Sequence, residues 1–407
     1  MTEFELRLQA IMRYLANEKP KNIYTSLKRS KRWFFKWLDR YQKYGETGLR
    51  DSSRRPLNSP NKTASDIEQM VINVRKSLTA RLTKETFYAP IGADSISWEL
   101  SNLGLNQIPS IPTINRIVKR NGLSQKQNKL GHKHSVPYPV PDMHRPNSLH
   151  QLDPVGPRYI KGIDGVEKFY SINLIDCYSR IATLRQYEDA RNLSITNFLL
   201  NVVWPNIGLP DKLQVDNMLS IKGSNRYPRS PGLVIRLCLL FGVEVLFIPI
   251  NEPQRNGFIE SFNNTFDKVF YQSQKFENLA HLKRESLQFE DYYCTKRPHS
   301  RLSKTKHGSK IPSEVHLTYQ PRLLSGNFTL NDFKVKGKIK VPLNEGKITF
   351  IRWINKSCKL DIFSEKFHLP ESMKYCYVTA TILTKEKVLQ VWYFNDLVQE
   401  FPYVLMD

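Results

Sequence analysis

Apolar residues recur at helical spacing at the start of the chain. Leu8, Ile11 and Leu15 follow one another at intervals of three or four residues, and a second periodic run covers residues 31–44. A short helical stretch lies between the two runs. The pattern predicts an all-α helix-turn-helix module over residues 1–48.

The second periodic run combines an apolar face with a basic face. Trp37 belongs to the inner face, together with either Trp33 or Phe34. A basic face opposite an apolar one is the expected design of a recognition helix in the major groove of DNA, and a solvated basic surface on a small bundle is the alternative. The predicted DNA contacts on this helix are Lys31, Arg32, Lys36 and Arg40.

The helical periodicity stops over residues 49–63, where Ser, Pro and Arg predict a basic linker. Arg54 and Arg55 can either reach a minor groove from this linker or belong to a plain tether. Helical spacing returns over residues 64–123, which predicts a second helix-turn-helix module, and residues 124–147 are interpreted as an extended connector. The DNA contacts predicted in the second module are Arg116, Lys119 and Arg120.

Apolar runs of strand length dominate the pattern from residue 148 onward. In residues 148–320 three such runs come first, and helical and strand-like runs then alternate, which predicts an α/β RNase H-like core. In residues 321–407, five short alternating segments predict a small all-β barrel. The predicted fold class is therefore multidomain, with N-terminal all-α helix-turn-helix modules, a central α/β RNase H-like core and a C-terminal barrel.

The chain is strongly basic, with a net charge of +23 over 407 residues. Such a charge favours a polyanionic partner, most commonly nucleic acid, over a generic charge for solubility. The most apolar run, residues 233–250, contains Arg236 and Glu244 and is too short and too charged to span a membrane. The five cysteines include no C-x-x-C pair, which argues against a zinc site or a disulfide scaffold and fits a reducing cytosol.

Three carboxylates stand out within the predicted α/β core. Asp153 and Asp216 end or interrupt strand-like runs, and Glu260 lies in a predicted helix that begins after Pro253. Carboxylates that face one another repel, so a site that holds three of them is usually stabilised by divalent cations, and their hard oxygen atoms select Mg²⁺ or Mn²⁺. Two such ions can clamp both the attacking and the leaving oxygen of a phosphodiester.

The segments around these acids extend the pattern beyond the three residues. They resemble the DDE transposase and retroviral integrase catalytic-core superfamily, and within it most closely the bacterial insertion-sequence transposases of the IS481 type. The resemblance depends on several motifs in the right order rather than on any one of them. The matching segments are 37–56, 175–180, 216–217, 253–262 and 293–302.

The resemblance implies a catalytic site built on Asp153, Asp216 and Glu260, which would bind two Mg²⁺ ions, with Mn²⁺ able to substitute. It implies that Asp176 occupies a common family position that is not a metal ligand. The residues that it implies as supports of the site are Asn217, Asn256 and Gly257.

The function implied by the resemblance is DNA transposition. Such a transposase binds the terminal inverted repeats of a mobile element as double-stranded DNA, hydrolyses a strand at each end and joins the freed 3′-hydroxyl to target DNA. Because two ends must be joined together, at least a homodimer is expected, and the need for an ATPase helper stays open. The expected location is the bacterial cytoplasm, in association with the nucleoid and without a membrane partner.

Two other functions stay open at this point. A catalytically inactive, transposase-derived DNA-binding protein or repressor would keep the basic modules, and a free nuclease would keep the acids. The chain also departs from the family pattern, because the separation between Asp216 and Glu260 is longer than usual and no Gly follows Asn217. The excess falls in residues 218–231, which are interpreted as a polar, basic insertion beside the site.

Overall fold

The structure is a computed structural model. It describes residues 2–52, 63–81, 83, 86–124, 136–162, 165–224, 226–324, 326 and 328–406. Arg54 and Arg55, predicted as linker contacts to DNA, lie outside the described residues. The chain divides into two compact units, Met1–Ala64 and Ser65–Asp407, and each is described by itself below.

The first unit is a small helical bundle. The helix predicted over residues 31–44 is present, and the Ser30 hydroxyl accepts a hydrogen bond from the Trp33 backbone N–H at 3.1 Å, which caps its first turn. Phe34, Trp37 and Leu38 are buried, so Phe34 rather than Trp33 completes the inner face. The helices are α1 (Glu3–Leu15), α2 (Pro20–Ser26) and α3 (Lys31–Tyr44), followed by a 3-10 turn at Gly45–Leu49.

The second unit begins with three helices that pack against its core. The ring of Tyr88 lies 6.1 Å from that of Phe270, 5.6 Å from that of Phe289 and 6.0 Å from that of Tyr292, measured between centroids. The apolar faces of these helices belong to the same hydrophobic cluster as those aromatic side chains. The predicted second module is therefore docked on the core. Its helices are α4 (Ser65–Ala80), α5 (Ala93–Asn102) and α6 (Ile111–Arg120).

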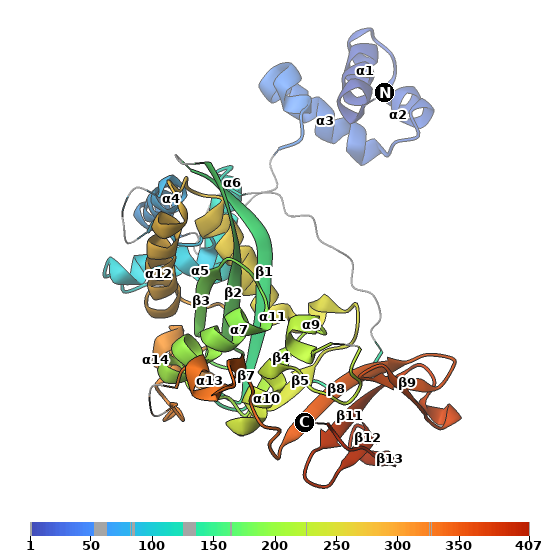
Figure 1. Cartoon of the computed structure of the whole chain (residues 1–407). Coiled ribbons are helices and arrows are strands. Elements are labelled where there is room, and N and C mark those ends of the chain that lie inside the picture. The colour runs from blue at the N-terminus through green and yellow to red at the C-terminus, as the bar shows by residue number, and fades with distance from the viewer. Residues whose placement is uncertain are drawn as a thin grey trace. The chain divides into compact units, whose positions relative to one another are not determined.

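The core is a mixed sheet with helices on both faces (Figure 1). Its first three strands are antiparallel neighbours, and two further strands run parallel to the first in the order β3-β2-β1-β4-β5. This is the RNase H-like arrangement that the order of runs predicted. The strands are β1 (Leu149–Gly162), β2 (Gly165–Asp176), β3 (Ala182–Tyr187), β4 (Lys212–Val215) and β5 (Glu244–Phe247).

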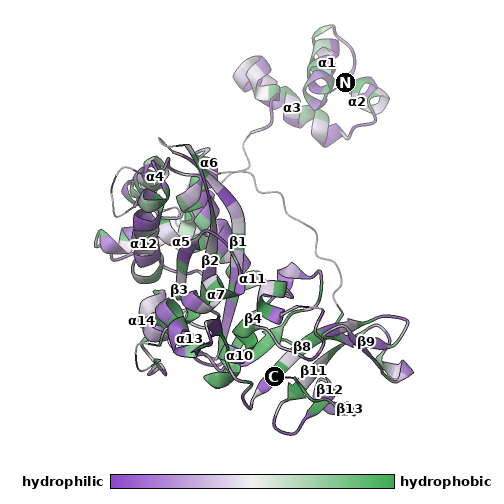
Figure 2. Cartoon of the chain, in the orientation of Figure 1, coloured by the Kyte–Doolittle hydropathy of each residue, from purple (hydrophilic) through white to green (hydrophobic). Residues whose placement is uncertain are grey.

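Alternation along the strands separates the two faces of the sheet. Leu152 and Leu174 point to the face that α7 and α10 cover, whereas Phe169 and Ile175 point to the face that α11 and α12 cover. Figure 2 shows the hydrophobic colouring concentrated along α10 and the strands beside it. The core helices are α7 (Asn192–Phe198), α8 (Trp204–Asn206), α9 (Leu219–Lys222), α10 (Leu233–Leu240), α11 (Gly257–Thr265), α12 (Leu279–Thr295), α13 (Lys304–His307) and α14 (Pro312–His316).

The C-terminal strands lie in sheets, as the predicted fold class requires, but they do not close into a separate barrel. In the described residues β8 pairs in parallel with β5, which extends the core sheet to nine strands in the order β13-β12-β11-β8-β5-β4-β1-β2-β3. The rings of Phe247 and Phe350 stack 4.8 Å apart, so the apolar layer of the core continues without a break into β8. Closing the strands on themselves would expose that layer. The strands after β5 are β6 (Lys334–Val335), β7 (Lys338–Ile339), β8 (Lys347–Ile354), β9 (Lys359–Ile362), β10 (Glu365–His368), β11 (Cys376–Leu383), β12 (Val388–Tyr393) and β13 (Asp396–Pro402).

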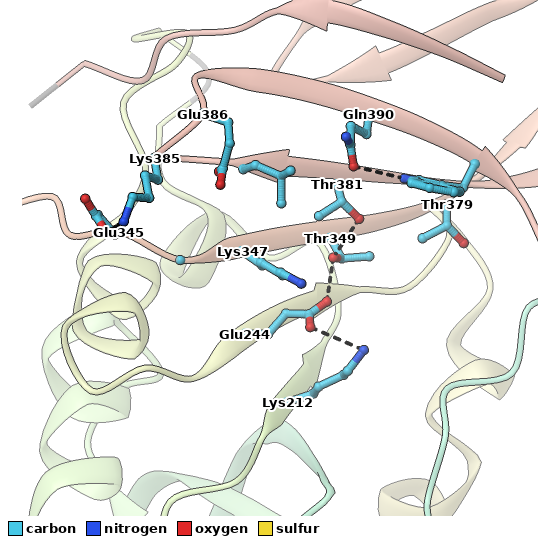
Figure 3. Close-up of a pocket in the computed structure, with 13 residues that line it drawn as sticks. Lys212, Glu244, Glu345, Lys347, Thr349, Thr379, Thr381, Lys385, Glu386 and Gln390 are labelled. Carbon is cyan, nitrogen blue, oxygen red and sulfur yellow. Dashed lines mark hydrogen bonds and ion pairs between the residues drawn. The ribbon is translucent and has the colours of Figure 1, made fainter. Parts of the chain in front are cut away.

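The opposite face of this extension is polar and hollowed (Figure 3). The Thr349 hydroxyl donates to the Glu244 carboxylate at 2.5 Å and lies 3.0 Å from the hydroxyl of Thr381. The Lys212 ammonium lies 3.2 Å from the same Glu244 carboxylate. These contacts join β4, β5, β8 and β11 across the junction of the core with the C-terminal strands.

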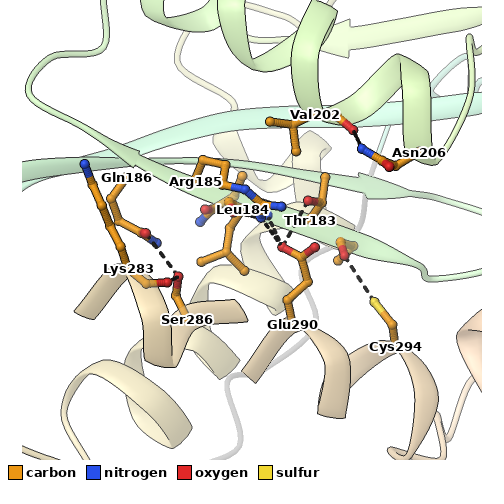
Figure 4. Close-up of polar contacts among 12 residues, drawn as sticks. Thr183, Leu184, Arg185, Gln186, Val202, Asn206, Lys283, Ser286, Glu290 and Cys294 are labelled. Atoms are coloured by element: carbon orange, nitrogen blue, oxygen red, sulfur yellow. Dashed lines mark hydrogen bonds and ion pairs between the residues drawn. The ribbon is translucent and has the colours of Figure 1, made fainter. Parts of the chain in front are cut away.

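The outer edge of the core sheet is covered by α12. The Glu290 carboxylate accepts hydrogen bonds from the Leu184 backbone N–H at 2.9 Å, the Thr183 hydroxyl at 3.0 Å and the Arg185 guanidinium at 2.7 Å (Figure 4). Because β3 is an edge strand, its outward N–H would otherwise be open to pairing with another chain. No helix in the described part of the chain is long and apolar enough to cross a membrane.

Candidate active site on the face of the sheet covered by helix α11

The three acids singled out in the sequence come from adjacent elements. Asp153 lies in β1, on the sheet face that α11 covers, and Asp216 follows the last residue of β4. In the parallel pairing of these strands Gln151 is opposite Gln214, and the same register carried two residues further puts Asp153 opposite Asp216. Glu260 lies in the first turn of α11, and all three side chains are half-buried.

The protonation of Asp153 reflects this crowding. Burial, followed by the charges of Asp216 and Glu260, raises the pKa of Asp153 to about 7, and a hydrogen bond from Asn263 acts in the opposite direction. Burial also raises the pKa of Asp216, against a hydrogen bond from the Met218 backbone N–H at 3.0 Å. The acids are within electrostatic reach of one another. Among the described residues, no three His, Cys, Asp or Glu side chains are already close enough together to hold a metal ion.

A chain of amide hydrogen bonds fixes the orientation of Asp153. The Asn263 amide donates to Asp153 Oδ2 at 2.8 Å, and the Asn173 amide donates to Asn263 Oδ1 at 2.8 Å. The Ser171 hydroxyl donates to Asn173 Oδ1 at 2.7 Å, which completes the chain inside the sheet. Asn263 lies one helical turn after Glu260, and this spacing was the signal in the sequence that could have identified it. Asn173 faces Asp153 across the β1–β2 pairing, a register that periodicity alone does not give.

Two glutamines anchor the start of α11 to the sheet. Gln151 Oε1 accepts hydrogen bonds from the backbone N–H groups of Phe258 at 3.1 Å and Ile259 at 3.0 Å. The Gln214 amide donates to the Asn256 side chain at 2.8 Å. Asn256, which the resemblance implied as a supporting residue, is thus buried and bonded beside the acids. A Cβ at Gly257 would meet nothing within 4 Å, so packing does not require glycine there.

Asn217 is held by a residue from the C-terminal strands. The Asn217 amide donates to the Ile248 carbonyl at 2.8 Å, and Arg352 Nη2 donates to Asn217 Oδ1 at 2.7 Å. Arg352 Nη1 also donates to the Ile248 carbonyl at 3.0 Å. Arg352 lies in β8 and is only 5% exposed, and burial lowers its pKa to about 10. The sequence analysis missed Arg352 because the pairing of β8 with β5 was not predicted.

Asp176 lies outside the acid group and has a structural role. Its carboxylate is fully buried and accepts hydrogen bonds from the Ser179 hydroxyl at 2.5 Å, the Ser179 backbone N–H at 2.9 Å and the Asn147 backbone N–H at 3.2 Å. These bonds hold the turn between β2 and β3.

The predicted insertion at residues 218–231 packs against the C-terminal strands. Arg229 forms two hydrogen bonds of 2.7 Å with the Glu365 carboxylate of β10, and its guanidinium lies 4.6 Å from the centre of the Tyr403 ring. The insertion thus ties the segment after Asp216 to the C-terminal part of the second unit.

Some of the predicted DNA-contact residues are exposed, whereas others are held by hydrogen bonds or ion pairs within the protein. In the first unit Lys31, Arg32 and Lys36 are exposed, whereas Arg40 is half-buried and donates to the Arg50 carbonyl at 2.9 Å. In the second unit Arg116 and Lys119 are exposed, and Arg120 forms a two-point ion pair with Glu68.

Comparison with known proteins finds family matches for two segments of the chain. Residues 241–305, which include α11 and Glu260, match the family described as Integrase core domain, and residues 1–50 match the family described as Homeodomain-like domain. The chain is thus similar to an integrase core domain in one segment and to a homeodomain-like domain in another, in agreement with the resemblance to the DDE transposase and integrase superfamily. The narrower assignment to the IS481 type stays a prediction.

Several solved integrase structures are similar to this chain at low identity. The catalytic core of HTLV-2 integrase in complex with magnesium, in its trimeric form, is 13% identical over 42% of this chain and 97% of its own, with a TM-score of 0.30. The simian T-cell lymphotropic virus intasome in complex with the PP2A regulatory subunit B56 gamma is 12% identical over 76% of this chain and 93% of its own, with a TM-score of 0.32. The catalytic core of BIV integrase is 13% identical over 42% of this chain and 95% of its own, with a TM-score of 0.30.

Proposed function

We propose that this protein is a DNA transposase that binds the terminal inverted repeats of a mobile element, cleaves a strand at each end and joins the new 3′-hydroxyl to target DNA. The observation that carries the proposal is the placement of Asp153, Asp216 and Glu260 on adjacent elements, where the charges of Asp216 and Glu260 act on Asp153. The match of residues 241–305, the segment around Glu260, to an integrase core domain supports the same function.

The chemistry of the donor set, rather than its present spacing, suits a pair of Mg²⁺ ions, for which Mn²⁺ would substitute. The three carboxylates offer hard oxygen ligands, and ionised Asp153 requires a nearby cation because its surroundings penalise the negative charge. Asn263 occupies only Oδ2 of Asp153, so Oδ1 stays available as a ligand. Magnesium bound there supplies the charge that activates the attacking oxygen and stabilises the leaving one. The residues Asn263, Gln151 and Arg352 act by holding the acids and their supports in position.

The test is a joining reaction with the full chain and DNA that carries the sequences flanking its gene. In Mg²⁺ we expect nicked ends with free 3′-hydroxyls and joined products, and EDTA should remove both. Binding of the ends without any nicking would favour the transposase-derived repressor, and cleavage without joined products would favour a free nuclease. Because two ends are joined together, the active species should be at least a dimer, with or without an ATPase helper.

The first unit should supply a salt-dependent part of DNA binding. Replacing Lys31, Arg32 and Lys36 together with Ala should weaken binding, because these exposed cations can neutralise phosphates. The slope of log K against log salt should become less negative by about 0.9 for each phosphate contact that is lost. Fluorescence anisotropy over a salt series measures this slope.

Lys43→Ala is the matched control for that experiment. Lys43 lies in the last turn of the same helix, and its ammonium is 3.1 Å from the Asp39 carboxylate, so its charge is already compensated. An unchanged slope in the triple variant would contradict the recognition-helix interpretation.

A further inference from the structure

An arginine-lined cavity of about 590 Å³ lies beside the helix that carries Glu260. Phe258 and Ser261 line it from the same turn of α11 as Glu260, and Arg180 and Arg301 line it from the segments after β2 and α12. No Asp or Glu is among its lining residues. Its chemistry therefore differs from that of the acid group next to it, and an anion is the kind of ligand that it fits.

The Arg180 side chain has the clearest unmet hydrogen-bonding capacity in this cavity. Its Nε and Nη1 atoms are buried without a partner among the described residues, and its guanidinium lies 3.9 Å from the centre of the Phe258 ring. Buried donors are almost always paired, so two orphaned donors on one guanidinium indicate a group that is absent from the protein alone. Stacking on Phe258 fixes the guanidinium plane without using its hydrogen-bond donors.

The backbone at Arg180 is also unusual. Its φ is +66°, a left-handed conformation that is uncommon for a residue other than Gly, Asn or Asp. The backbone N–H of Arg180 donates to the Asp176 carbonyl at 2.9 Å, so the conformation belongs to the turn that Asp176 holds. Strained residues of this kind cluster at ligand-binding sites, where the direction of the side chain compensates the cost of the backbone.

The positive charges around the cavity repel one another. Arg301 is exposed and forms no ion pair with a described residue, and its charge lowers the pKa of Arg180, after the larger effect of burial. Arg255 also lines the cavity, but it already pairs with Glu252 at 2.9 Å. His299 adds no charge, because its pKa is lowered to about 3 by burial and, to a smaller extent, by the neighbouring arginines. A bound anion would relieve the repulsion between Arg180 and Arg301.

The polar groove of the C-terminal sheet does not offer the same chemistry (Figure 3). Its volume is similar, about 630 Å³, but Lys212 lies 3.2 Å from the Glu244 carboxylate and Lys385 lies 3.2 Å from the Glu345 carboxylate. Its charges are therefore balanced within the protein. In the cavity beside α11, neither Arg180 nor Arg301 forms an ion pair with a described residue, and this difference selects it as the anion site.

We propose that Arg180 and Arg301 bind a backbone phosphate of the DNA strand that lies across α11, next to the carboxylates. The inference rests on the proposed function, because it assigns the anion to the DNA substrate. Two guanidinium groups that line one cavity suit a phosphate, which accepts several charge-assisted hydrogen bonds at once. Gly257 lines the cavity and leaves open space where a side chain would stand, so the strand can approach the helix closely.

The test measures DNA binding without catalysis, with the full chain in EDTA. Arg301→Gln and Arg180→Gln should each weaken binding of end-bearing DNA about tenfold, the scale of one lost charge-assisted contact. Arg284→Gln is the matched control, because Arg284 is 68% exposed on α12 and away from the cavity. Thermal unfolding of each variant shows whether Arg180→Gln has lost its fold. If it has, Arg301→Gln still tests the proposal, because Arg301 is exposed and its substitution should leave the fold intact.

A phosphate-by-phosphate scan locates the contact. Single phosphates are replaced with neutral methylphosphonates. At one position near the cleavage point the replacement should weaken binding of the DNA to the wild-type chain. Binding to Arg301→Gln should be unaffected by the replacement at that position, and should respond like the wild type at all others. Wild-type joining together with unchanged DNA binding by both variants would overturn the phosphate site and leave the proposed function intact. Loss of binding in the variants without any joining by the wild type would support the site and count against the function.

Inorganic phosphate tests whether the cavity binds a phosphate of DNA or a free phosphate ion. If phosphate at millimolar concentration protects the chain against thermal unfolding and the variants bind DNA normally, the cavity holds a free anion and the DNA assignment is wrong. If phosphate competes with DNA for the wild type but not for Arg301→Gln, the assignment is supported.

Discussion

Replacing Asp153 with Asn is expected to abolish strand cleavage and joining in Mg²⁺ while raising the thermal stability of the metal-free chain. Asn supplies no anionic oxygen, so the site would lose one of the three carboxylates that would hold the metal. Two-metal clamps supply several kcal/mol of transition-state stabilisation, and the expected loss of rate is about a thousandfold or more. Product formation in a single-turnover joining assay measures it.

The stability gain follows from the pKa of Asp153. In the unfolded chain this carboxyl ionises near 3.8, whereas in the folded chain it ionises near 7. A folded-state pKa above the unfolded one means that full stability is present below pH 3.8 and that part of it is lost as the pH rises to 7. The difference corresponds to roughly 4 kcal/mol at most, reduced by the water that reaches this half-buried side chain.

The melting temperature of the variant should therefore be only slightly above that of the wild type near pH 4, and the difference should be largest above pH 7. Thermal unfolding in EDTA at pH 5 and pH 8 checks this expectation. Asp291→Asn is the matched control, because Asp291 is exposed on α12 and its neutralisation should change neither stability nor joining. A melting-temperature difference that is the same at both pH values would contradict the placement of Asp153 among like charges.

Local pattern was sufficient to predict the elements that carry the acids. The alternation before Asp153 and Asp216 gave strands that are present as β1 and β4, and the run after Pro253 gave the helix α11. Flanking residues with specific chemistry, such as Asn256 and Gly257, separated these acids from the many others in the chain. The sequence thus predicted the elements on which these acids lie, because side-chain type and spacing are local properties, and the catalytic role of the three acids stays a prediction.

The features that the sequence did not predict depend on pairings between distant segments. Periodicity predicts a strand over residues 347–351, but not that this strand lies beside β5, so a small separate barrel was predicted and Arg352 was overlooked. Asn173 was missed for the same reason, since its position opposite Asp153 is a matter of register. Arg180 was noted only as part of a turn, because the cavity in front of it is built by α11 and by the segment after α12.

Replacing Arg352 with Met should destabilise the chain and weaken its response to magnesium. The guanidinium donates to Asn217 Oδ1 and to the carbonyls of Ile248 and Asp361, and Met supplies none of these hydrogen bonds. Each unsatisfied buried acceptor costs about 1–3 kcal/mol, so a loss of about 3–5 kcal/mol in the free energy of unfolding is expected. Chemical denaturation in EDTA measures that loss.

The magnesium response separates a positioning role from a purely structural one. Without Arg352, Asn217 loses one of the two bonds that fix the turn after Asp216, so more Mg²⁺ should be needed for half-maximal joining. Arg352→Lys keeps the charge but loses the two-point geometry, and it should recover part of the stability and less of the magnesium response. Lys347→Met is the control on the same strand, because Lys347 is exposed. If Arg352→Met unfolds more easily but joins DNA at the same magnesium concentration as the wild type, β8 contributes only to the core, and the acids are positioned without the C-terminal strands.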